Sequence, residues 1–357
     1  MYHIQYGIKR RLREYYTKLF LIASFAPPCG GVYIILFYDI LTHMNSNRII
    51  ESTRVVVVGA GFVGSTAAFA IMTQGIASEI VLIDVNADKC QGEAMDLEHG
   101  LSFIPMSRVW AGDYSDCAQA DVIVITAGVG QKIGQTRLEL ASTNAKIIRE
   151  IMRKVAAYAP PDAIILMVSN PLDVMTYLAL KESGFSKNRV FGTGTTLDSS
   201  RFRLLLGEAL GVDPDSVGAY VLGEHGDSEF PVVSHANVMG EPLKNISGYT
   251  EEMMRGAFEK TKRAAYEVIG KKGATYYAIA LAVSRIVHAI LNNEQHTFPV
   301  STLLEGEYGL HDVCVSVPAV VGRNGIERIL SIQLSTEESK QLQNSAQIIR
   351  SAIDSVL

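Results

Sequence analysis

Cysteine is scarce in this sequence, and its spacing fits no metal-binding motif. The four cysteines, Cys29, Cys90, Cys117 and Cys314, are scattered and form no Cys-x-x-Cys pair. This pattern excludes a disulfide-stapled scaffold and a zinc ribbon. No other cluster of residues has the spacing of a zinc or calcium site, so we expect no metal. Free thiols are typical of a reducing compartment, which predicts a cytoplasmic protein.

A surplus of positive charge is also missing. The 32 Lys and Arg residues are outnumbered by 37 Asp and Glu, which gives a net charge of −5 and a pI of about 5.9. The composition therefore offers no basic surface for nucleic acid. Internal repeats and low-complexity linkers are absent too. With 48% hydrophobic and 19% charged residues over a length of 357, the chain suits a globular protein of two domains.

The first 43 residues differ in composition from the rest. A basic segment (8–16) precedes an apolar segment (19–41) that an aspartate and Pro-Pro and Gly-Gly pairs interrupt. Three interpretations stay open: a signal peptide, a membrane anchor, or an artefact of gene calling with the natural start at Met44. We therefore set residues 1–50 apart as an atypical N-terminal extension. Membrane association is expected only if the first 43 residues are a genuine anchor.

Residues 54–75 begin a strand–helix–strand unit. A short β-branched run is followed by a glycine-rich turn and then by apolar residues at helical spacing, and Gly75 ends the helix. Residues 79–86 form a second short apolar run. Because both runs are too short for helices, we interpret them as buried parallel strands of a βαβ unit.

The same alternation continues along the chain. Apolar strands are expected at 121–128 and 163–171, with a helix at 137–157 between them. Alternating strands and helices are typical of a parallel sheet covered by helices on both faces. We predict an α/β fold with a Rossmann-type doubly wound sheet over residues 51–192.

The pattern changes after this sheet. A long helix with one apolar face is expected at 275–291. Residues 313–335 contain two strand-like runs joined by Asn324-Gly325, a strong hairpin signal. These features predict a mixed α+β substrate domain over residues 193–357.

The last helix has its own start signal. Ser335 and Glu338 have the spacing of a capping box ahead of a run with helical periodicity. The apolar face of this predicted helix carries Leu342, Ala346, Ile349 and Ile353.

The glycine-rich turn has the pattern of a dinucleotide-binding site. GAGFVG follows a predicted strand and opens a predicted helix, which is the context that gives a Gly-x-Gly-x-x-Gly motif its meaning. Gly59 would allow the tight turn, Gly61 the approach of a pyrophosphate, and Gly64 close packing of helix and strand. Asp84 ends the next strand and would accept hydrogen bonds from ribose hydroxyls while repelling a 2′-phosphate. The motif thus predicts NAD rather than NADP, the alternative being a structural turn.

His225 lies in VLGEHGDSEFP, between two acidic residues and two glycines. Hydride transfer to a carbonyl needs a proton donor, stabilisation of developing negative charge, and a substrate clamp. An imidazole is suited to the first task. Asp198 would fix its tautomer, and Arg201, on the same helix face, would bind a substrate carboxylate. A surface turn for His225 and a solvated ion pair for the other two are the alternative interpretations.

A glycine-rich segment, AGVGQKIGQTRLEL (127–140), follows the strand expected at 121–128. It lies at the carboxyl edge of the predicted sheet, where ligands bind in such folds. We expect a mobile loop that closes over the substrate and brings Arg137 to the carbonyl, the alternative being a solvated flexible loop. Asn170, in VSNP, is expected at the same edge, within reach of substrate or nicotinamide ribose.

These motifs together resemble the lactate/malate dehydrogenase family over about residues 53–357. The resemblance is carried, in order, by GAGFVG, LIDV, AGVGQKIGQTRLEL, VSNPLD, GTGTTLDSSRFR, GEHGDSEFP and KKGATYYAIA. It implies a catalytic set of His225 with its partner Asp198, the carboxylate clamp Arg201 and the carbonyl polariser Arg137, and a substrate pocket that adds Gln131, Asn170 and Thr275. It extends the cofactor contacts to Val63, Lys89, Tyr114, Gly128, Val129, Val168, Asn170 and Thr193. It also implies a homotetramer.

Gln131 is the residue that bears on the substrate. Malate enzymes of this family typically have arginine at the matching position, because a second carboxylate cannot be buried cheaply without a cation. A neutral glutamine and a small Thr275 favour the methyl group of pyruvate, so we predict reduction of pyruvate to L-lactate in glycolysis and fermentation. The neighbouring Lys132 keeps malate dehydrogenase activity as an alternative. A second alternative is a non-catalytic NAD-binding protein.

Some bacterial relatives are activated by fructose 1,6-bisphosphate through an arginine and a histidine. Arg203 matches the arginine, but Gly218 stands where the histidine would be. One of the two anion ligands is therefore missing, which argues against activation.

Overall fold

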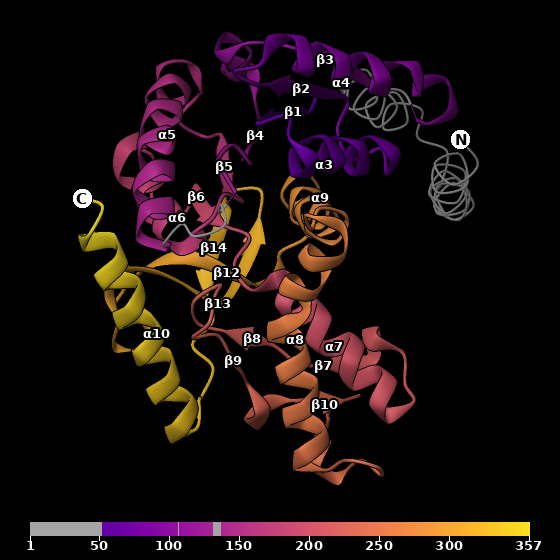
Figure 1. Ribbon diagram of the computed structural model, residues 1–357, viewed down its shortest axis with the longest axis vertical. Coiled ribbons are helices and arrows are strands. Elements are labelled where there is room, and N and C mark those ends of the chain that lie inside the picture. Colours follow the sequence, from indigo (N-terminus) through magenta and orange to yellow (C-terminus); the bar gives the residue numbers. More distant parts are fainter. Residues whose placement is uncertain (1–51, 106, 131–136) are drawn as a thin grey trace, which may run out of the picture. The chain divides into compact units, whose positions relative to one another are not determined.

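The structure, a computed structural model, describes residues 52–105, 107–130 and 137–357. The N-terminal extension predicted at residues 1–50 lies outside this part of the chain. Residues 53–357 form one unit, built around a central sheet (Figure 1). None of the described helices is both long enough and apolar enough to cross a membrane.

The central sheet has nine strands in the order β14-β13-β12-β6-β5-β4-β1-β2-β3. Six of them are parallel: β1 (Arg54–Val58), β2 (Glu79–Ile83), β3 (Arg108–Ala111), β4 (Val122–Ile125), β5 (Ile164–Met167) and β6 (Val190–Gly192). Three antiparallel strands extend the sheet beyond β6: β12 (His296–Glu305), β13 (His311–Gly322) and β14 (Gly325–Ile329). The predicted α/β fold class is confirmed.

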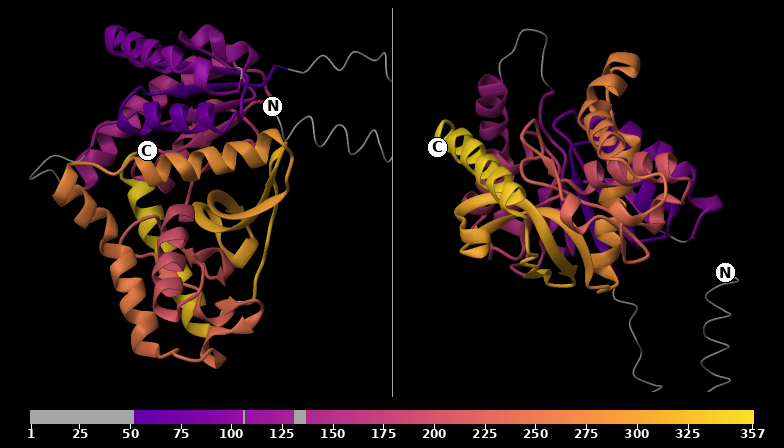
Figure 2. Two further views of the ribbon diagram at one scale, coloured as in Figure 1. Left: turned by 90° about the vertical axis from the view of Figure 1, so that its right-hand side faces the viewer. Right: turned by 90° about the horizontal axis from the view of Figure 1, so that it is seen from below.

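Helices cover both faces of the sheet because the strands are apolar on both sides. In β1, Val55 and Val57 point into one core, whereas Val56 and Val58 point into the other. The first core is closed by α3 (Phe62–Thr73), α4 (Ala87–His99) and α9 (Tyr277–Leu291). The second is closed by α5 (Arg137–Tyr158), α6 (Leu172–Ser183) and α10 (Thr336–Asp354). Figure 2 shows α9 alongside α3, two helices far apart in sequence that pack together.

A third core lies outside the central sheet. It is formed by α7 (Thr196–Leu210), α8 (Glu251–Lys272) and the short strands β7 (Val217–Gly218) and β10 (Asn237–Val238). The exposed strand β11 (Glu241–Pro242) pairs with β10. Strands β8 (Val221–Leu222) and β9 (Phe230–Pro231) form a separate pair. Six short 3₁₀ helices complete the described elements: Leu101–Phe103, Tyr114–Gln119, Pro214–Ser216, Val233–His235, Leu243–Asn245 and Glu307–Gly309.

Several strands are shorter than the sequence predicted. The runs expected at 79–86, 121–128 and 163–171 end as strands at Ile83, Ile125 and Met167. The apolar pattern overestimated them because the residues that follow turn into the loops of the sheet's carboxyl edge. Asp84, for example, accepts a hydrogen bond from the backbone of Ala60 instead of continuing the ladder.

The predicted hairpin is confirmed, but its turn begins one residue earlier. Gly322 pairs with Gly325, so Arg323 and Asn324 form the turn and Gly325 starts β14 with a φ of +81°. The second strand ends at Ile329 rather than near 335, and the chain then leaves the sheet. The last helix, α10, begins with the predicted capping box.

The domain boundary predicted at residue 192 falls at the end of β6, inside the continuous sheet. Strand β12, from the predicted second domain, pairs with β6 through Ser301 and Gly192. The division into two domains stays a prediction.

Candidate active site

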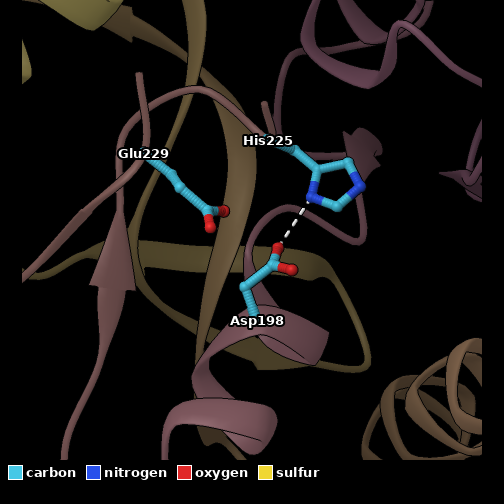
Figure 3. A group of neighbouring side chains, drawn as sticks. All are labelled: Asp198, His225 and Glu229. Carbon is cyan, nitrogen blue, oxygen red and sulfur yellow. Dashed lines mark hydrogen bonds and ion pairs between the residues drawn. The ribbon is translucent and has the colours of Figure 1, made fainter. Parts of the chain in front are cut away.

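The predicted histidine, aspartate and arginine lie together. Asp198 and Arg201 sit in the first turns of α7, and His225 follows β8. The Nδ1 atom of His225 is 2.7 Å from Oδ2 of Asp198 (Figure 3). Nη1 of Arg201 donates to Oδ1 of the same carboxylate at 2.9 Å. Asp198 is only 3% exposed, whereas the side chain of His225 is 27% exposed. A buried carboxylate thus holds an imidazole that still reaches solvent.

The backbone around His225 is fixed as well. Its N–H donates to Oδ2 of Asp173, in the first turn of α6, at 2.8 Å. Gly223, two residues before His225, has a φ of +96°, and a Cβ there would lie 2.6 Å from Oγ of Ser345. Only glycine fits this bend without strain. The histidine is therefore held at both its main chain and its ring.

Neighbouring charges and hydrogen bonds together outweigh burial in setting the protonation of Asp198 and His225. Burial opposes ionisation of Asp198, but His225 and Arg201 outweigh it and hold the pKa of Asp198 below its usual value. Burial alone would lower the pKa of His225, yet the adjacent Asp198 raises it to about 9. At neutral pH the imidazole therefore carries a proton that it can donate.

A third acidic side chain, Glu229, points toward this pair (Figure 3). Glu229 is 7% exposed. Burial, followed by the charge of Asp198, raises the pKa of Glu229 to about 8. Glu229 is accordingly neutral over most of the physiological range.

One ligand atom from each of Asp198, His225 and Glu229 lies within 4.8 Å of the others. Zinc holds its ligand atoms at about 2.0–2.3 Å from the ion, and a histidine ligand must present a deprotonated nitrogen. Here Nδ1 of His225 is engaged with Asp198, and the raised pKa of His225 favours its protonated form. The cluster is better suited to proton transfer than to metal binding. The predicted absence of a metal stays a prediction.

The glycine-rich turn has the geometry that a dinucleotide requires. Gly59 has a φ of +107°, and a Cβ on it would lie 2.6 Å from the backbone nitrogen of Ala127. A Cβ on Gly64 would come within 1.8 Å of the carbonyl oxygen of Gly59, so strand and helix pack in contact. Around Gly61, in contrast, a Cβ would meet nothing within 4 Å. The turn is packed on the protein side and open at Gly61.

The N-terminus of α3 is also free to bind an anion. Its first turn has no side-chain cap and no acidic residue. The unpaired N–H groups and the helix dipole favour a phosphate at this position. Asp84 lies at the end of β2, half-buried, and its Oδ2 accepts the Ala60 N–H at 2.7 Å. These residues fit the pyrophosphate and ribose of a dinucleotide.

The remaining predicted cofactor residues follow the carboxyl ends of the strands or open the helices after them. Val129 is 40% exposed, whereas Thr193 is 2% exposed and offers little surface to a ligand. Burial raises the pKa of Tyr114, which is half-buried, to about 12. The others are placed as follows: Val63 in α3, Lys89 in α4, Gly128 after β4, and Val168 after β5.

The predicted substrate residues are only partly described. Asn170 is exposed just beyond β5, and Thr275 is half-buried between α8 and α9. Arg137 is the first residue of α5, but its side chain lies outside the described part of the chain, as does Gln131. That these two side chains lie near His225 therefore stays a prediction.

Three polar residues of this region were missed by the sequence analysis: Asn144, Asp173 and Glu229. All three are buried, with 1%, 2% and 7% exposure. Asp173 is the last residue of the VSNPLD segment, and Glu229 lies within the His225 motif, so their positions in quoted motifs were available signals. Asn144 lies in a helical stretch with no signal in the sequence.

Comparison with known families gives two matches. The NAD-binding domain of lactate/malate dehydrogenases matches residues 53–192, and the α/β C-terminal domain of the same enzymes matches residues 195–357. The chain belongs to the lactate/malate dehydrogenase family. The family predicted from the sequence motifs is thus confirmed.

Members of the family with high similarity are named as lactate dehydrogenases. L-lactate dehydrogenase of Acetivibrio thermocellus is 49% identical over 315 residues, covering 87% of this chain and 98% of the relative. L-lactate dehydrogenase 1 of Clostridium acetobutylicum is 47% identical over 311 residues, covering 86% and 99%. The crystal structure of the minor L-lactate dehydrogenase of Enterococcus mundtii superimposes with a TM-score of 0.84 at 45% identity, covering 86% of this chain and 99% of that one.

Proposed function

We propose that this protein is an NAD-dependent L-lactate dehydrogenase that interconverts pyruvate and L-lactate. The observation that carries the proposal is the cluster of His225 and Arg201 around the buried Asp198, because this one carboxylate orients both an imidazole and a guanidinium. A non-catalytic NAD-binding protein has no need for such a cluster. The high identity to enzymes named L-lactate dehydrogenase supports the same conclusion.

His225 is proposed as the general acid and base. Asp198 accepts a hydrogen bond from the Nδ1–H group of His225, which leaves Nε2 to face the substrate. In pyruvate reduction, Nε2–H donates its proton to the carbonyl oxygen as the carbon accepts hydride. In lactate oxidation, neutral Nε2 takes the proton from the hydroxyl group. The carboxylate of Asp198 stabilises the imidazolium in both directions.

Arg201 is proposed as the clamp for the substrate carboxylate. Only its Nη1 is hydrogen bonded within the described residues, so the rest of the guanidinium is free to bind a carboxylate through two parallel bonds. Arg137, at the start of α5, is proposed to polarise the carbonyl group. Both arginines would hold the keto acid in a reactive orientation and offset the negative charge that develops on oxygen.

The cofactor is proposed to bind at the turn of Gly59, Gly61 and Gly64, with its pyrophosphate at the N-terminus of α3. When bound, the nicotinamide supplies or accepts the hydride. Asp84 would accept hydrogen bonds from the ribose hydroxyls and disfavour a 2′-phosphate, which supports NAD over NADP. The residues Val63, Lys89, Tyr114, Gly128, Val129, Val168, Asn170 and Thr193 are proposed as further cofactor contacts.

The choice of pyruvate over oxaloacetate is proposed to depend on Gln131 and Thr275, with Asn170 as a further substrate contact. Steady-state kinetics on both keto acids tests it: kcat/KM should be higher for pyruvate, and Gln131→Arg should shift the ratio toward oxaloacetate by about tenfold or more, since an unpaired buried carboxylate costs several kcal/mol. The matched control is Lys132→Arg, which leaves the charge unchanged and should not shift the ratio. A native preference for oxaloacetate would overturn the proposal in favour of malate dehydrogenase.

The compartment, oligomeric state, pathway and regulation of the enzyme are proposed from its similarity to the family. We infer a cytoplasmic homotetramer acting in glycolysis and fermentation, without bisphosphate activation. Gly218 supports the last point, because a Cβ there would lie 2.7 Å from Nδ2 of Asn237 and a histidine would not fit without movement. Titration with fructose 1,6-bisphosphate should leave the KM for pyruvate unchanged.

A further inference from the structure

Asn144, near the start of α5, has a fully satisfied amide in the interior of the protein. Its side chain is 1% exposed. Oδ1 accepts a hydrogen bond from the N–H of Val129 at 2.9 Å, and Nδ2 donates to the carbonyl oxygens of Val129 at 3.1 Å and Asn170 at 2.7 Å. One side chain thus joins the segments that follow β4 and β5, two neighbouring strands of the sheet.

Both joined segments belong to the proposed active site. Val129 and its neighbour Gly128 are proposed cofactor contacts, and Asn170 is a proposed substrate contact. A Cβ on Gly128 would lie 3.3 Å from Oδ1 of Asn144, so this segment rests directly on the amide. The helix that carries Asn144 begins at Arg137, the proposed carbonyl polariser. The amide therefore lies where the cofactor segment, the substrate segment and α5 meet.

We infer that Asn144 is a positioning residue, which sets the cofactor segment after β4 at a fixed distance from Asn170. The inference rests on the proposed function. An amide is the side chain that can accept from one N–H and donate to two carbonyl groups at once. An aspartate of the same shape has no donor when ionised, and its charge would face two carbonyl oxygens. Asn144 is buried, and its three hydrogen bonds go to Val129 and Asn170, so we infer that it acts through these two residues.

Two substitutions test this role. Asn144→Asp keeps the shape and the acceptor but loses both donors, and Asn144→Ala removes all three bonds. In each we expect a higher KM for pyruvate, a higher dissociation constant for NADH, and a fall in kcat/KM of about 100-fold, the loss that a displacement of roughly 1 Å can cause. The matched control is Thr261→Val, which removes a buried hydrogen bond to Ala257 within α8 and should leave all three constants unchanged.

A measurement on the native protein complements the variants. Because Asn144 holds the Val129 N–H, that amide should exchange slowly with deuterium in the absence of cofactor, and faster in any Asn144 variant that folds. Rapid exchange in the native protein would overturn the inference. So would variants that fold but keep the native KM and NADH affinity, since a purely structural role lowers thermal stability without changing these constants. A native protein that binds NADH but does not reduce pyruvate would instead count against the proposed function, while NADH affinity would still report on Asn144.

Discussion

The two ends of the proposed active site are built in opposite ways. Around His225, the geometry depends on the polar groups of side chains, because Asp198, Arg201 and Glu229 surround the imidazole with charges and hydrogen bonds. At the glycine-rich turn, the geometry depends instead on the absence of side chains. There a Cβ on Gly64 would overlap the backbone of the turn. The catalytic end is therefore defined by electrostatics, and the cofactor end by steric fit.

This difference predicts where each kind of substitution will show its effect. Changes in the charged cluster alter proton transfer, so they should appear in kcat and in the pH dependence of the rate. Changes in the glycine turn alter steric fit, so they should appear in folding or in cofactor affinity. Three experiments, in decreasing order of effect, test whether the two ends can be separated in this way.

The largest effect is expected for His225→Ala. Loss of the proton donor should lower kcat by about 10²- to 10⁴-fold, the usual contribution of general acid–base catalysis. NADH affinity should stay native, because the glycine turn is untouched. The control, His99→Ala, removes an exposed histidine at the end of α4 and should leave kcat unchanged. A kcat for His225→Ala within a few-fold of native would remove the histidine from the mechanism.

A pair of glycine substitutions separates packing from binding. Gly64→Ala places a methyl group 1.8 Å from a carbonyl oxygen and should lower the free energy of unfolding by about 1–3 kcal/mol or more, as overpacking does. Gly61→Ala meets no atom within 4 Å, so the unfolding free energy should change by less than about 0.5 kcal/mol. NADH affinity should nevertheless fall in Gly61→Ala, because the methyl group occupies the space of the pyrophosphate. Thermal unfolding and fluorescence titration with NADH measure the two effects. Native NADH affinity in Gly61→Ala would place the cofactor elsewhere.

The same contrast explains what the sequence could predict. The glycine turn is a local motif, so its strand, turn and helix could be predicted from neighbouring residues, as could the capping box of α10. Asp198 and Arg201 share one helix face, so their proximity followed from helical spacing. Their contact with His225 followed from chemical reasoning and family resemblance, because no local pattern joins residues so far apart in sequence.

Other features depend on contacts that no local pattern encodes. Asn144 bonds to Val129 and Asn170, which lie on two separate strand ends, and its helix shows only ordinary apolar periodicity. Glu229 is buried because the segment after His225 folds back toward Asp198. From the sequence alone, an acidic residue in a glycine-containing turn would be predicted to be exposed to solvent. Strand ends were overestimated for a related reason, since apolar residues continue past the last ladder hydrogen bond into the loops of the active site.

The smallest effect, and the most specific to the charged cluster, is expected for Glu229→Gln. Above its own pKa of about 8, Glu229 is ionised, and its negative charge then adds to that of Asp198 in raising the pKa of His225 to about 9, so the glutamine variant should have a lower His225 pKa. We expect the rate of pyruvate reduction to fall as pH rises through the pKa of His225, and this fall should move to lower pH in Glu229→Gln. The control is Glu259→Gln, an exposed position on α8, which should leave the profile unchanged.

The same variant, Glu229→Gln, should be more stable than the native protein at alkaline pH. The pKa of Glu229 is raised to about 8 in the folded protein, from 4.5 when unperturbed, so ionisation destabilises the fold progressively as pH rises from about 4.5 through 8. Glutamine cannot ionise and escapes this penalty. Glu229→Gln should therefore melt at the native temperature at pH 4 and above it at pH 9. Equal melting temperatures at pH 9 together with an unshifted rate profile would mean that Glu229 does not interact with His225, and that the charged cluster consists of Asp198, Arg201 and His225 alone.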